Sequence, residues 1–131
     1  MTSGSLFGIK RLLVATAVME MGTGLALVAV PSPVAILLLG SPLDAPVPAT
    51  VGRVAGVALL VLGLVCWFGR HDGNSRATRG LVGAMFVYNA GVSLVLAHGG
   101  VTLGLTGVAL WPTALLHTIM GIWCLVVSRR P

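Results

Sequence analysis

Four long apolar runs divide the chain, and short polar or proline-rich segments separate them. The runs cover about residues 12–30, 51–68, 80–97 and 108–127. Each run is close to the roughly 20 residues that a helix needs to cross a bilayer. Because the connections are short, consecutive helices are expected to lie antiparallel. The pattern predicts an all-α, four-helix transmembrane bundle with up-down-up-down topology, forming one integral membrane domain over residues 1–131.

The segment between the first two runs is apolar but rich in proline. Pro31 and Pro33 are expected to end the first helix, because proline lacks a backbone donor and clashes inside a helix. The apolar residues 34–40 are too few to cross a membrane, so a short interfacial or re-entrant segment is predicted there. Three further prolines in residues 41–50 predict an extended external loop.

The two later connections differ in character. Residues 70–79 form the most polar stretch of the chain and are predicted to be a cytoplasmic turn. Residues 99–107 are rich in glycine and form the predicted connector to the fourth helix, with His98 closing the third helix at the external surface.

Small residues recur at helical spacing and are expected to pack helices of the same chain together. Gly52 and Gly56 form a GxxxG pair in the second run, which lets two helix backbones approach closely. A similar role is expected on the third and fourth runs for Gly80, Ala84, Gly91, Ala114 and Gly121.

The composition requires a membrane. Hydrophobic residues make up 56% of the chain and charged residues only 8%, where soluble chains carry about 25% charged residues. With a mean hydropathy of +1.03, the apolar surface is too large for a soluble domain of this size. The first run contains Glu20 and is longer than the apolar region of a signal peptide, so it is expected to be retained.

The charged residues lie mainly on one side of the predicted bundle. Before the first run, in the middle connection and after the last run stand Lys10, Arg11, Arg70, Arg76, Arg79, Arg129 and Arg130. The opposite side carries only Asp44 and, at a helix edge, Arg53. This positive-inside pattern predicts a multi-pass protein of the bacterial inner (cytoplasmic) membrane with both termini cytoplasmic. No aromatic-rich basic face accompanies the net charge of +5, so nucleic acid is not an expected partner.

Four polar residues share one depth in the membrane. At a rise of about 1.5 Å per residue, Glu20, Tyr88 and Asn89 all lie roughly 12–14 Å from the cytoplasmic edge, and His117 lies near mid-depth. Polar residues in a membrane face the interior of the bundle and usually have partners. These four residues are the predicted ligand- or proton-binding site. A structural interpretation stays open, in which a protonated Glu20 hydrogen-bonded to Asn89 or His117 only fixes the register of the helices.

Arg53 is the fifth candidate residue. Its side chain has three possible fates, which are to reach inward to Glu20, to pair with Asp44, or to extend to the lipid headgroups, and the last is the commonest.

Other chemistry finds little support in the sequence. Cys66 and Cys124 are expected to be small buried side chains rather than a disulfide. A bis-histidine haem is disfavoured because His98 and His117 lie at different depths. No hydrolase, nucleotide-binding or metal motif occurs, so neither an enzyme nor a metal site is expected.

Several segments resemble a family of small, four-span bacterial integral membrane proteins. They are Glu20-Met-Gly-Thr-Gly-Leu-Ala-Leu, Pro31-Ser-Pro with Leu37-Leu-Leu-Gly, Arg53-Val-Ala-Gly, Tyr88-Asn89, and Leu110-Trp-Pro with His117. The resemblance covers nearly the whole chain and implies the four-span fold, without implying an activity.

Two other families have a similar layout. The small multidrug resistance transporters are similar in length and number of spans, and Glu20 stands where they carry a glutamate in the first helix; this chain lacks their tryptophan- and tyrosine-rich later motifs. DoxX-like proteins are similar in size, but their lysine-ended first-helix motif is missing here.

The leading functional hypothesis is a small membrane accessory or binding protein. It would associate with a larger membrane complex or with copies of itself, or hold a hydrophobic ligand such as a quinone or lipid through the polar layer. The alternative is a proton-coupled exporter of small molecules in which Glu20 alternates between proton and substrate.

Overall fold

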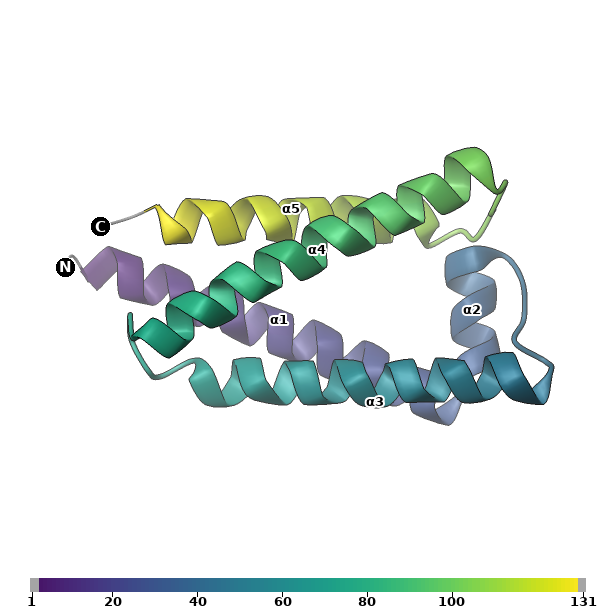
Figure 1. Ribbon diagram of the computed structural model, residues 1–131, viewed down its shortest axis with the longest axis horizontal. Coiled ribbons are helices and arrows are strands. Elements are labelled where there is room, and N and C mark those ends of the chain that lie inside the picture. Colours follow the sequence, from purple (N-terminus) through teal and green to yellow (C-terminus); the bar gives the residue numbers. More distant parts are fainter. Residues whose placement is uncertain (1–2, 130–131) are drawn as a thin grey trace.

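The computed structural model describes the backbone of residues 3–129 and the side chains of residues 8–129, so Arg130 lies outside the described residues. The described part contains five helices: α1 (Ser3–Ala29), α2 (Pro31–Leu39), α3 (Pro46–Gly69), α4 (Arg76–Thr102) and α5 (Leu110–Ser128). All except α2 contain a stretch long and apolar enough to cross a membrane. These four run alternately in opposite directions, which confirms the predicted all-α, four-helix bundle (Figure 1).

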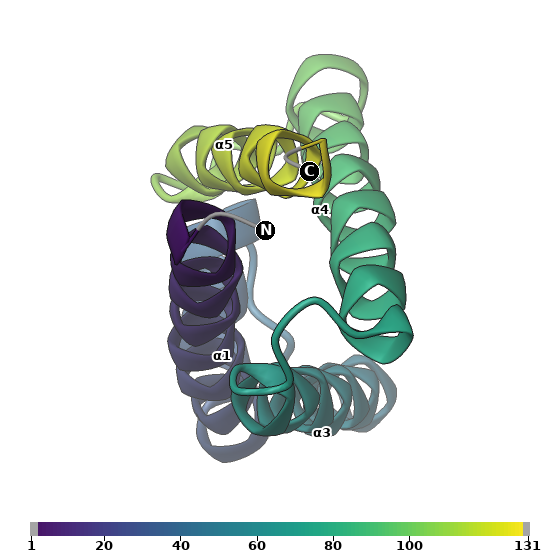
Figure 2. The same cartoon turned by 90° about the vertical axis from the view of Figure 1, so that its left-hand side faces the viewer.

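The bundle is built from two helix pairs. α1 packs along α3, and α4 packs along α5 (Figure 2). The two pairs meet in the half of the bundle that holds the start of α1 and the end of α5 (Figure 1). Buried side chains from all four long helices fill this half: Ile9, Leu12, Leu13, Ala17, Cys66, Val82, Met85, Met120, Cys124 and Val127. At the opposite end, α2 lies across the bundle and contacts both α3 and α5.

Glycines allow the close approach of α1 to α3. A Cβ atom built on Gly56 would lie 2.7 Å from the carbonyl oxygen of Gly24, and one built on Gly24 would lie 2.6 Å from the carbonyl oxygen of Gly56. Because both obstacles are backbone atoms, neither position has room for a side chain. Gly52 is buried as well. The prediction that the glycines of the second span pack within the chain is confirmed.

The same prediction is wrong for the third span. Gly80 and Gly91 are exposed, and no atom lies within 4 Å of the place where their Cβ atoms would stand. Their face of α4 points away from the rest of the chain. On α5 the prediction holds, because Ala114 is buried and a Cβ on Gly121 would lie 3.6 Å from the Cβ of Asn89.

The helices extend further than the apolar runs. α3 begins at Pro46 and includes residues 46–50, so the predicted extended loop is confined to residues 41–45. A proline at the first helical position costs little, since its missing donor would have no partner there. α4 begins at Arg76, where the backbone N–H of Thr78 donates to Oγ of Ser75 at 3.1 Å. Polar and proline residues in first turns are therefore helical although they interrupt the hydrophobic pattern.

α2 occupies the place of the short segment predicted after the first span, and it is helical. Pro31 and Pro33 do follow the end of α1, but they also form the first turn of α2, so the helix begins before residue 34. Gly40 ends α2 with φ of 81°, a conformation that glycine adopts without steric cost. The backbone N–H of Ala109 donates to the carbonyl of Leu37 at 2.8 Å, which ties α2 to the start of α5.

Candidate functional site

Glu20 and Tyr88 join the two helix pairs. Glu20 lies in the middle of α1 and is 4% exposed, and Tyr88 lies in the middle of α4. The hydroxyl of Tyr88 donates to Oε2 of Glu20 at 2.9 Å. The sequence had suggested Asn89 or His117 as the partner of this carboxyl; the structure gives it Tyr88 instead, because Tyr88 rather than its neighbour faces α1.

Asn89 and His117 form a second buried contact, between α4 and α5. Nδ2 of Asn89 donates to the carbonyl oxygen of Met85 at 2.8 Å, which leaves Oδ1 of the amide facing Nδ1 of His117 at 2.8 Å. With the amide in this orientation Oδ1 only accepts, so Nδ1 of His117 carries the hydrogen. Asn89 and His117 are 2% and 7% exposed.

The two contacts meet through aromatic rings. The rings of Tyr88 and His117 pack edge to face, with centroids 5.6 Å apart and planes at 78°. Glu20, Tyr88, His117 and Asn89 therefore form one continuous polar layer that runs from α1 through α4 to α5. The predicted convergence of these four residues is what the structure displays.

A cavity of about 510 Å³ lies directly against this layer. All five helices contribute to its walls, which are largely apolar, and α2 supplies Val34, Leu37 and Leu38. The polar side chains that line it are Glu20, Thr23, Tyr88, Thr113 and His117. Asn89 does not line the cavity and acts on it only through His117.

Arg53 does not belong to the layer. Its side chain is exposed, and Nε donates to the carbonyl oxygen of Val28 at 3.2 Å. Carbonyls in the last turn of a helix lack partners within the helix, so Arg53 satisfies one at the end of α1. Among the described residues Arg53 makes no hydrogen bond to Glu20 or Asp44, and its extension to the lipid headgroups stays a prediction. His98 is exposed near the end of α4 and does not line the cavity either.

The sequence did not single out Thr23, Thr113 or the three α2 residues. Thr23 follows Glu20 by three residues and Thr113 precedes His117 by four, which places each on the face of its helix that carries the polar residue. This spacing was the available signal. The sequence holds no comparable signal for α2, because its contribution depends on how the segment folds back.

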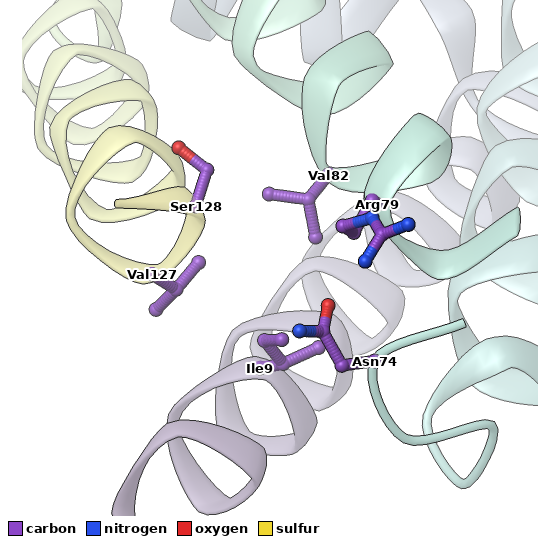
Figure 3. Close-up of a pocket in the computed structure, with 6 residues that line it drawn as sticks. All are labelled: Ile9, Asn74, Arg79, Val82, Val127 and Ser128. Atoms are coloured by element: carbon purple, nitrogen blue, oxygen red, sulfur yellow. The ribbon is translucent and has the colours of Figure 1, made fainter. Parts of the chain in front are cut away.

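Two other features lie outside this site. The pocket of Figure 3, between residues such as Asn74 and Arg79 and the end of α5, measures only about 70 Å³, space for a few water molecules at most. Cys66 and Cys124 are free and buried, with Sγ of Cys66 lying 3.6 Å from Sδ of Met85. In the described part of the chain, no three His, Cys, Asp or Glu residues gather as metal ligands would.

Comparisons with protein-family models, with curated proteins and with solved structures gave no match to this chain. Its function is accordingly inferred from the geometry of the polar layer and the cavity.

Proposed function

We propose that this chain is a small integral membrane binding protein that holds a lipophilic molecule, such as a quinone or lipid, in the cavity between its two helix pairs. The observation that carries the proposal is the cavity of about 510 Å³ with Glu20, Tyr88 and His117 along one side. The proposal assigns the protein no catalysis of its own.

The composition of the cavity supports this role. Sites for small molecules are typically about 300–1,000 Å³, mostly apolar, and carry a few convergent polar groups that orient the ligand. Here the apolar walls suit a chain or ring system, and the polar groups lie on three different helices at one level. Burying several polar groups only to fix helix register would not require a cavity beside them.

The cellular setting is part of the same proposal. The resemblance to small four-span proteins favours the bacterial inner membrane, and the positive-inside rule favours cytoplasmic termini. An accessory role, in which the ligand is held for a larger membrane complex or for a homo-oligomer, is consistent with described residues that form mainly four apolar helices.

Native mass spectrometry of the protein, extracted from its own membrane in mild detergent, tests the proposal. We expect a constant added mass on the wild type, either alone or in a larger assembly. Val92→Trp fills the cavity and is expected to lose the added mass, because Val92 lines its wall. Leu94→Trp is the matched control on the same helix, since Leu94 is 71% exposed and does not line this cavity. The proposal would be contradicted if both variants carried the same added mass, or if the wild type carried no added mass.

One observation favours the alternative of a proton-coupled exporter. Glu20 is the acidic side chain that lines the cavity, where a substrate could meet it. A Glu20→Gln variant separates the two functions. Resistance to toxic lipophilic compounds, and proton release on adding them, would both be lost from an exporter; if both are unchanged in Glu20→Gln, the exporter hypothesis is wrong.

A further inference from the structure

We propose that the polar head of the ligand donates a hydrogen bond to Nε2 of His117, so that the cavity selects lipophilic alcohols, phenols and quinols over ethers and quinones of the same shape. This inference rests on the proposed function and narrows the ligand of the same cavity to a lipid with a hydroxyl head or to the reduced, quinol form of a quinone.

Asn89 determines which nitrogen of His117 is left for a ligand. Because the amide nitrogen of Asn89 is engaged by the carbonyl of Met85, the amide oxygen faces Nδ1 of His117. The hydrogen of a neutral imidazole then lies on Nδ1, and Nε2 has a lone pair that accepts. Asn89 is thus a positioning residue, buried behind the histidine that lines the cavity.

Nε2 of His117 has no partner in the described part of the chain, and neither has Oε1 of Glu20. The one buried side-chain nitrogen or oxygen without a hydrogen bond among the described residues is Oγ1 of Thr16. Nε2 and Oε1 are therefore not sealed inside the protein. His117 and Glu20 both line the cavity, and the proposal places their unused atoms within reach of the molecule that occupies it.

Tyr88 supplies no competing donor. A phenol carries one hydroxyl hydrogen, and Tyr88 directs its hydrogen to Glu20. A ligand head beside His117 and Tyr88 consequently meets the acceptor Nε2 and the lone pairs of the phenol oxygen. A ligand head with a hydroxyl hydrogen can donate it to Nε2 of His117. An ether or carbonyl oxygen at the same place has no hydrogen to donate, so it would face Nε2 and the phenol oxygen as a third acceptor.

A matched pair of probes isolates this one hydrogen. 4-Heptylphenol and 4-heptylanisole share an apolar chain and ring, and the methyl ether differs in having no donor. Titration of the detergent-solubilised protein at pH 8, followed by native mass spectrometry, gives both affinities. We expect the phenol to bind about 10-fold to 100-fold more tightly, the range that an unsatisfied buried acceptor costs.

Variants assign the preference to the proposed atoms. His117→Phe is expected to abolish the preference for the phenol while the ether still binds. Asn89→Asp keeps an acceptor for Nδ1 and should retain the preference, whereas Asn89→Leu should reduce it. The tautomer of His117 is measured by ¹⁵N NMR of the imidazole, and the signal of His117 is the one that disappears in His117→Phe. We expect the hydrogen on Nδ1 in the wild type and in Asn89→Asp. In Asn89→Leu we expect a mixture of the two tautomers.

The outcomes separate this inference from the proposed function. Equal affinity for the two probes, with binding of both lost in Val92→Trp, would overturn the donor preference and leave the binding function intact. Failure of both probes to bind would count against the cavity as a binding site. His117 also borders a more open groove on the outer face of α4 and α5, which Leu94 lines; loss of the phenol in Leu94→Trp but not in Val92→Trp would overturn the inference.

Discussion

The hydroxyl of Tyr88 reaches Oε2 of Glu20 across 68 positions of the sequence and binds it at 2.9 Å. The bond joins α1 to α4, and these helices belong to different pairs of the bundle. It therefore links two units that otherwise meet mainly through the apolar half of the molecule and through α2.

Tyr88→Phe is expected to loosen the two pairs. The variant keeps the aromatic ring against His117 and removes only the hydrogen bond, at a cost of about 1 kcal/mol in the free energy of unfolding. Unfolding by sodium dodecyl sulfate in mixed micelles measures this. Ser128→Ala is the control, because the hydroxyl of Ser128 bonds only the carbonyl of Leu125 in its own helix. Equal stability of the two variants would show that the Glu20–Tyr88 bond does not hold the pairs together.

Gly56→Ala is expected to destabilise the fold although it adds only one methyl group. The new methyl group would meet the carbonyl of Gly24 at 2.7 Å and force α1 away from α3, with a loss of about 1–3 kcal/mol in the free energy of unfolding. The matched control is Gly91→Ala, whose methyl group meets nothing within 4 Å. There the better helix propensity of alanine should leave stability unchanged or raise it by up to about 1 kcal/mol. The same unfolding assay should rank the two variants clearly, and a reversed order would refute this packing.

The orientation of the chain can be read by thiol labelling. His71 lies in the connection from α3 to α4, and Ser41 lies just after α2; both residues are exposed. The α3–α4 connection is at the end of the bundle that holds the start of α1 and the end of α5, and α2 is at the opposite end (Figure 1). With cytoplasmic termini, a membrane-impermeant maleimide should label Ser41→Cys on intact spheroplasts, and His71→Cys only after lysis.

The native cysteines provide the background for that experiment. Cys66 and Cys124 are 0% and 1% exposed, so the unmodified chain should stay unlabelled until it is unfolded. Labelling of His71→Cys, but not of Ser41→Cys, on intact cells would reverse the proposed orientation.

The fold followed from the sequence because its main determinant is length. Each of the four apolar runs is long enough to cross a membrane, and no soluble arrangement could cover them. What the pattern missed lies at the helix ends, where Pro46 and Arg76 begin helices although they interrupt the apolar runs. Helix ends depend on caps and on the positions of free donors, and these leave little trace in hydrophobicity.

The polar layer was predicted from depth, but its hydrogen bonds were not. Counting residues along each helix brought Glu20, Tyr88, Asn89 and His117 to one level. Adjacent residues on a helix point about 100° apart, so rotation decides that Tyr88 faces Glu20 while Asn89 faces His117. Helix rotation is set by the packing of whole faces, including the crossing of Gly24 with Gly56, and no single residue encodes it.

α2 sets the distance between the two helix pairs at one end of the bundle. Nine helical residues span about 13.5 Å, and this short rod stands between the two pairs at the end where they are apart. The width of the cavity is thus set by the number of helical residues between Pro31 and Gly40, and not by the long helices. Lengthening or shortening α2 by one turn would change the size of molecule that fits, while the polar layer that recognises its head would stay as it is.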